Sequence, residues 1–72
     1  MSDPVFICRS NAGYPASLEP RKVYVAIDDA VARARGLLRV IDESGEDYLY
    51  PSDLFVRVDL PEATRRALHL AA

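Results

Sequence analysis

The stretch from Leu37 to Val58 constrains the fold more than any other, because turn signals divide it into three apolar runs. The turn around Ser44 and Gly45 predicts a β-hairpin between the first two runs. It fits either a two-residue hairpin loop or a type I turn with Gly45 as a bulge, and these differ by one residue in register. Pro51 has no amide hydrogen for a strand ladder, so it ends the second run. A tight turn then leads into a third strand.

Two further strands are expected in the first part of the chain. The apolar run VFIC contains β-branched and aromatic residues and predicts a strand over 5–8. Residues 22–27 alternate, with Val23, Val25 and Ile27 on one face and Tyr24 on the other. The loop over 10–20 is rich in glycine and proline, and we expect Leu18 and Tyr14 to hold it against the core. The five strands are expected at about 5–8, 22–27, 37–42, 47–50 and 55–58.

A short helix is expected between the second and third strands. Asp28 and Asp29 stand where a helix N-cap is wanted, and Gly36 stands where a left-handed C-terminal residue is wanted. The residues between them are good helix formers, and Val31 is expected to point inward.

A second helix is expected over about 60–70, at the end of the barrel strands. Asp59 and Glu62 have the spacing of a capping box. Leucine and alanine recur along one stripe, and Arg65 and Arg66 are expected to face water. The stripe fits either the open end of the sheet or the same helix of a second chain.

Length and charge limit what the chain does. Seventy-two residues make one domain, 1–72. The net charge of −2 and the single lysine give no basic footprint for a phosphate backbone, so nucleic acid is disfavoured. One cysteine and one histidine are too few for a tetrahedral zinc site. The sequence shows neither a signal peptide nor an apolar run long enough for a membrane span, and we expect a cytoplasmic protein with no membrane contact.

These elements predict a mainly β class with short helices. A long first loop, a central hairpin and a one-turn helix before the fifth strand resemble an SH3-like barrel, over about 5–58. The resemblance is most specific at Pro51-Ser52-Asp53-Leu54-Phe55, which is similar to a Pro-Ser-Asn-Tyr-Val segment of that fold. The chain has no Trp, and Leu54 replaces the tyrosine of that segment. Binding of polyproline peptides is therefore not expected.

The chain also resembles a group of small bacterial and phage proteins without an established activity. The similarity covers roughly residues 5–60. It is carried by Cys8 to Tyr14, Lys22 to Tyr24, Asp42 to Tyr48, and Tyr50-Pro51. It implies a fold and no particular reaction.

Aromatic and basic residues give one candidate partner-binding surface. Tyrosine rings with a polar tip are favoured in recognition surfaces. Tyr24, Tyr48 and Tyr50, with Arg39 nearby, are the candidates. The alternative is ordinary cross-strand packing with hydroxyls reaching water.

The hairpin turn carries an acidic tip made of Asp42, Glu43, Glu46 and Asp47. Four carboxylates around one turn suggest either an oxygen-ligand calcium site or a dock for a basic partner. The alternative is a solvated tip that discourages edge-to-edge aggregation. We expect no bound metal and no cofactor.

No pattern of nucleophile, base and orienting residue is visible, and Cys8 in an apolar strand reads as a buried small side chain. We therefore expect a non-catalytic binding or accessory module that contacts an unidentified protein. A nucleic-acid-associated regulator is the first alternative, and it requires Arg9, Arg33, Arg35 and Arg39 to converge on one face. A structural homodimer through the C-terminal helix is the second.

Overall fold

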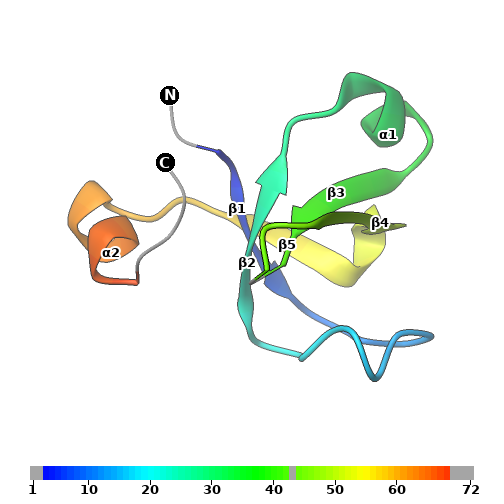
Figure 1. Ribbon diagram of the computed structural model, residues 1–72, viewed down its shortest axis with the longest axis horizontal. Helices are drawn as coiled ribbons and strands as arrows, with labels where there is room; N and C mark the ends of the chain where they lie inside the picture. The colour runs from blue at the N-terminus through cyan, green and yellow to red at the C-terminus, as the bar shows by residue number, and fades with distance from the viewer. Residues whose placement is uncertain (1–2, 43, 69–72) are drawn as a thin grey trace.

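The computed structural model describes residues 3–42 and 44–68. Five antiparallel strands form one sheet in the order β4-β3-β2-β1-β5 (Figure 1). They lie within two residues of the expected positions, and the mainly β class is confirmed. Over the described residues, β4 and β5 are the two edges of the sheet and do not pair with each other. The strands are β1 (Val5–Cys8), β2 (Val23–Ile27), β3 (Leu37–Ile41), β4 (Asp47–Pro51) and β5 (Phe55–Val58).

Helix α1 (Ala30–Ala34) connects β2 to β3, as expected. The Asp29 side chain caps it by accepting a hydrogen bond from the Ala32 amide, and Gly36 follows with φ of 72°. The prediction that Val31 points inward is wrong, because Val31 is 64% exposed while Ala32 is buried. A single helical turn lies close to β3 along Ala32, whose small side chain permits that approach.

The hairpin between β3 and β4 has the bulged turn. The Gly45 amide donates to the Asp42 carbonyl at 3.0 Å, and the Asp42 amide donates to the Glu46 carbonyl at 2.8 Å. Gly45 has φ of 87°, as a glycine bulge requires. Of the two registers left open by the sequence, the structure therefore has the one with Gly45 as the bulge.

The hydrophobic core lies on one face of the sheet, which we call the inner face. Cys8, Tyr24, Val40 and Phe55 from four strands pack there against Leu18. Leu18 is fully buried and Tyr14 packs against the same cluster, so the expectation that both hold the long loop to the core is confirmed.

The opposite face of the sheet, the outer face, bears Val25 and Ile27 of β2. The alternation predicted for β2 is present, and the core cluster around Leu18 lies on the Tyr24 side, although Val25 on the other side is also only 8% exposed. Both faces of β2 are apolar, so the alternation separates the two faces but does not indicate which one the long loop covers. In the structure the long loop crosses the Tyr24 face.

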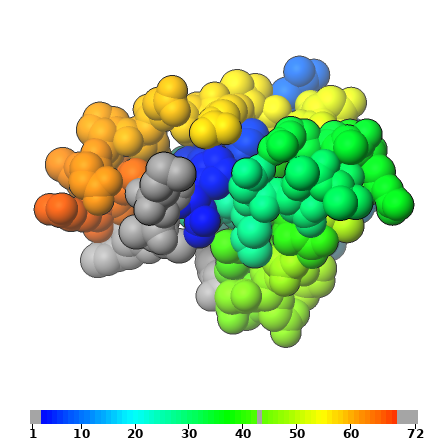
Figure 2. Space-filling view, turned by 90° about the horizontal axis from the view of Figure 1, so that it is seen from above, coloured from blue at the N-terminus to red at the C-terminus, as the bar shows by residue number. Residues whose placement is uncertain are grey.

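A 3₁₀ turn, η1 (Ser52–Leu54), leads into β5, and helix α2 (Glu62–Ala67) follows that strand. Figure 2 shows α2 and α1 on opposite sides of the molecule. Helix α2 ends at Ala67 with Leu68 as its C-cap, and residues 69–70 of the predicted helix lie outside the described residues. Neither helix of the described chain has the length and apolar character needed to cross a membrane.

Two predictions about α2 are wrong. The capping box does not form, because the helix begins at Glu62 after Pro61 and no side chain caps it. Arg65 does not face water: it is only 9% exposed, and its guanidinium donates to the Asp3 carbonyl at 2.9 Å. A long arginine stem covers apolar surface while its head finds a backbone acceptor. Arg66 is exposed, as predicted.

Candidate functional site

The outer face exposes a row of side chains across three strands. Strand register places Ile27 of β2 opposite Arg39 of β3, and Arg39 opposite Leu49 of β4. Side chains at paired positions lie on the same face of a sheet. Ile27 is 38% exposed and Leu49 is 42% exposed. An apolar side chain therefore stands on each side of Arg39 in contact with solvent.

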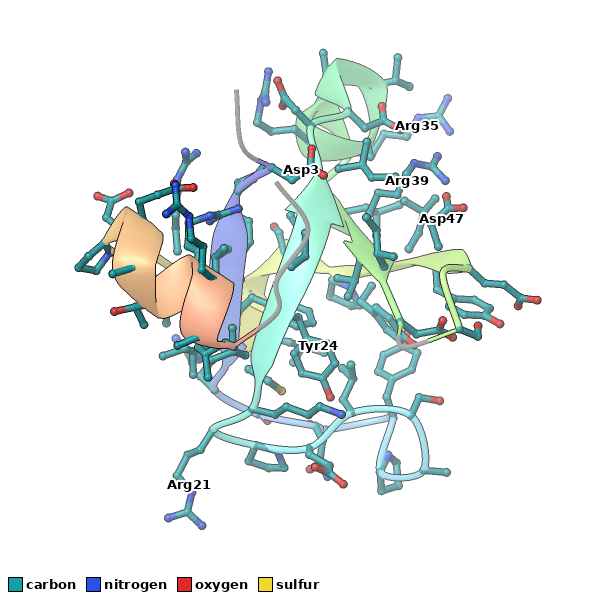
Figure 3. All side chains as sticks on the ribbon, turned by 60° about the vertical axis from the view of Figure 1, so that its left-hand side comes forward. Asp3, Arg21, Tyr24, Arg35, Arg39 and Asp47 are labelled. Carbon is teal, nitrogen blue, oxygen red and sulfur yellow. The ribbon has the colours of Figure 1, made fainter. Side chains whose placement is uncertain are left out.

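Arg39 is held in this row by two carboxylates. Its Nε donates to Asp29 Oδ2 at 2.9 Å, and its NH1 donates to Asp47 Oδ2 at 2.5 Å. Figure 3 shows Arg39 beside Asp47. The Ala32 amide and then Arg39 hold the pKa of Asp29 below its ordinary value, and the hydrogen bond to Asp47 raises the pKa of Arg39. Arg39 thus joins the cap of α1 to β4.

Tyr48 of β4 lies next to this row in sequence but on the other face of its strand. It is 45% exposed. Its hydroxyl donates to Glu46 Oε2 at 2.5 Å, and this bond raises the pKa of Tyr48 to about 12. The phenol therefore stays neutral over the physiological range. Together Tyr48 and Leu49 expose apolar surface on both faces of one edge strand.

The other predicted tyrosines lie in or beside the core. Tyr24 is buried, and its hydroxyl accepts a hydrogen bond from the Glu19 amide. Tyr50 is half-buried, with its ring 5.1 Å from that of Tyr14 and 6.2 Å from that of Phe55. Tyr24 cannot offer its ring to a partner without unpacking the core. Of the three candidates, Tyr48 alone is well exposed.

The described carboxylates of the acidic tip point to different partners. Asp42 turns back on its own loop and accepts from the amides of Ser44 and Glu46 and from the Ser44 hydroxyl. The Ser44 hydroxyl is the largest reason why the pKa of Asp42 is lowered. Asp47 accepts from Arg39 and Glu46 accepts from Tyr48. Glu43 lies outside the described residues.

This arrangement does not assemble the tip into a cation site. Within 3–42 and 44–68, no group of three or more His, Cys, Asp or Glu side chains is placed to hold a metal ion. The described tip carboxylates are instead engaged with groups of their own hairpin and with Arg39.

The four arginines proposed for a basic face do not all lie together. The Arg9 amide donates to the Leu54 carbonyl, at the end of β1 remote from α1. Arg33 pairs with Asp28 at 2.5 Å, and Arg39 lies between two carboxylates. Arg35 extends from the end of α1 on the same side as Arg39 (Figure 3). The structure therefore lacks the convergence that the nucleic-acid alternative requires.

A cleft separates α2 from the start of β1 and the end of β5. Its volume is about 240 Å³, and its lining includes Asp3, Arg57, Glu62 and Arg65. Charges of both signs are mixed there, and Arg65 is already engaged with the Asp3 carbonyl. We therefore interpret the cleft as the junction between α2 and the sheet.

Sequence reasoning missed Ile27 and Leu49. Neither residue is among the partner-binding candidates that the sequence predicts, which are Tyr24, Tyr48, Tyr50 and Arg39. A signal was present for Leu49: it alternates with Tyr48 and Tyr50 on a strand that ends in proline, which is typical of an edge.

Comparison with known proteins assigns no family. No protein-family model matches the chain, and no curated protein or solved structure is similar enough to be matched. A function for the chain is therefore inferred from the geometry of the outer face.

Proposed function

We propose that the chain is an SH3-like barrel domain that binds protein through the outer face of β2, β3 and β4, without catalysis. The barrel is supported by the long loop before β2, the β3–β4 hairpin, η1 before β5, and the return of β5 beside β1. An edge strand that returns to the first strand brings a small sheet toward closure.

The observation that carries the binding role is the row Ile27–Arg39–Leu49. Apolar side chains on the outside of a small sheet are a common mark of a contact surface, particularly when polar groups stand among them. Arg39 is fixed by Asp29 and Asp47, so it presents a rigid, ion-paired guanidinium between two apolar side chains. A partner that covers the row gains apolar burial without having to order this side chain.

A non-catalytic role agrees with the position of the most reactive side chain. Cys8 is fully buried in the core, and its thiol donates to the Ser10 carbonyl. A thiol in apolar surroundings is a poor nucleophile. Cys8 therefore serves packing.

The test compares immobilised wild-type protein with the double variant Ile27→Thr/Leu49→Thr. Threonine is β-branched and suits a strand, and it removes most of the apolar contact. Val56→Thr is the matched control, because Val56 is also exposed but lies on β5 at the other edge. We expect proteins captured from a cell extract by the wild type and by Val56→Thr to be lost with the double variant.

Purified candidates should then show at least tenfold weaker binding to the double variant by calorimetry. Equal capture by the double variant and the control would refute the proposal. Nucleic acid that stays bound at moderate salt would support the regulatory alternative instead.

A further inference from the structure

The edge of β4 that points away from β3 is exposed, and both faces of this strand also carry exposed side chains. The first three residues of the strand are exposed, and among the described strands only β3 pairs with it, along one edge. Tyr48 and Leu49 leave apolar surface on both faces of this strand. A long apolar edge is a template for another strand.

The backbone groups available at this edge follow from the ladder. The Asp42 amide bonds to the Glu46 carbonyl, so that pair is a hydrogen-bonded one. Hydrogen-bonded and non-hydrogen-bonded pairs alternate along an antiparallel ladder. In the observed register, Tyr48 and Tyr50 therefore direct their amides toward β3, whereas Asp47 and Leu49 direct theirs away from the sheet.

Charge on this edge does not block pairing. Edge strands usually avoid association by carrying charged side chains. On β4 the charged group is Asp47, whose carboxylate is already paired with Arg39 at 2.5 Å within the same chain. On β5, the other edge strand, the exposed Arg57 is among the residues whose backbone groups point away from the sheet. Of the two edges, β4 is therefore the better template.

We propose that β4 is a dimerisation strand, paired antiparallel with β4 of a second copy across a two-fold axis at Leu49. In this register Leu49 faces Leu49, Tyr48 faces Tyr50, and Asp47 faces Pro51. Such an arrangement is self-complementary, as a two-fold interface requires. Pro51 has no amide hydrogen, so the Asp47 carbonyl opposite it has no donor from the second copy. This pair stands at the end of the paired segment, where water reaches that carbonyl.

The two-fold registers centred on Asp47 and on Pro51 fit this strand less well. Centring the axis on Asp47 brings two carboxylates face to face, which destabilises a strand pair. Centring the axis on Pro51 places two residues that lack an amide opposite each other. The Leu49-centred register keeps the acidic tips of the two copies at opposite ends of the paired segment.

The second copy is a specific case of the proposed protein partner, and it therefore rests on the proposed function. A five-residue strand buries little area, so we expect a reversible dimer with a dissociation constant in roughly the micromolar to millimolar range. The dimer extends the two sheets into one continuous sheet and covers Leu49.

The first experiment follows amide signals by NMR as wild-type protein is concentrated from about 20 µM to 2 mM, with sedimentation in parallel. We expect association, with shifts and exchange protection at the amides of Asp47 and Leu49 and much smaller changes at Tyr48 and Tyr50. This alternation is specific to strand pairing. A protein that stays monomeric throughout overturns the dimer. Loss of capture by Ile27→Thr/Leu49→Thr in that case would leave the proposed function standing.

Variants locate the interface. Leu49→Pro removes an outward amide without touching the ladder to β3, and Leu49→Lys places two like charges at the axis. Each should weaken association at least tenfold, with Val56→Lys on β5 as the matched control. Circular dichroism shows whether each variant is folded, and the lysine variant serves if the proline variant is not. Association that survives both but is lost with Leu68→Glu would move the interface to α2 and overturn the assignment to β4.

Discussion

The hydroxyl of Tyr24 accepts a hydrogen bond from the amide of Glu19 at a distance of 3.0 Å. Tyr24 is the second residue of β2, and Glu19 lies near the end of the long loop between β1 and β2. This contact, together with the buried Leu18, ties the loop to the inner face of the sheet. It also explains why Tyr24 serves the core rather than the surface.

We expect Tyr24→Phe to lower the free energy of unfolding by about 1 kcal/mol, because the Glu19 amide loses its acceptor while the ring still fills its place. Urea denaturation measures the difference. Tyr48→Phe is the matched control, since its hydroxyl bond to Glu46 is at the surface, and it should change stability little. Equal effects of the two substitutions would contradict the structural role of Tyr24.

Stability should depend on Asp29 in acid. The pKa of its carboxyl is lowered in the folded protein, first by the Ala32 amide and then by Arg39. A lowered folded pKa means that the stabilisation is present above about pH 4 and is lost as the pH falls through the folded pKa. We expect Asp29→Asn, which keeps a capping oxygen but carries no charge, to lose less stability than the wild type below about pH 4.

The measurement is a series of urea midpoints across that pH range for both proteins. Asp42, whose pKa is also lowered, titrates in both and cancels in the comparison. Parallel pH profiles for the wild type and Asp29→Asn would show that Asp29 has no such role.

Two neighbouring arginines in α2 should differ sharply. Arg65→Ala removes a buried stem and its bond to the Asp3 carbonyl, and we expect it to cost about 1–3 kcal/mol of stability. Arg66→Ala alters an exposed side chain 3.8 Å from Glu62 and should change stability by less than about 0.5 kcal/mol. Thermal unfolding of both variants tests this. A larger effect at Arg66 than at Arg65 would contradict the orientation of the helix.

The strands and α1 were predictable because their signals are local. Proline at 51, glycine at 36 and 45, and aspartate at 29 each act on the residues beside them. The choice between the two hairpin registers was not predictable, since both place Gly45 at a position with positive φ. The structure resolves it through the bond between the Gly45 amide and the Asp42 carbonyl.

Which residues face inward and which face outward depends on tertiary contacts, and the sequence does not show these contacts. Val31 is more apolar than Ala32, but a one-turn helix close to β3 favours the smaller side chain at the contact. The sequence predicts a solvated Arg65, because only the fold shows that the start of β1 lies beside α2. For the candidate site, Arg39 and Tyr48 were predicted on chemical type, whereas Ile27 and Leu49 depended on knowing which face the long loop covers.

The position of β1 between β2 and β5 has a consequence for synthesis of the chain. Of the five strands, β1 is synthesised before the others and has one of its two partners in residues 55–58, so one edge of β1 stays unpaired until residues 55–58 have emerged. The β3–β4 hairpin, by contrast, closes over a short loop and forms early. Translation pauses before residue 55 should therefore prolong the exposure of the β1 edge to chaperones and to other nascent chains.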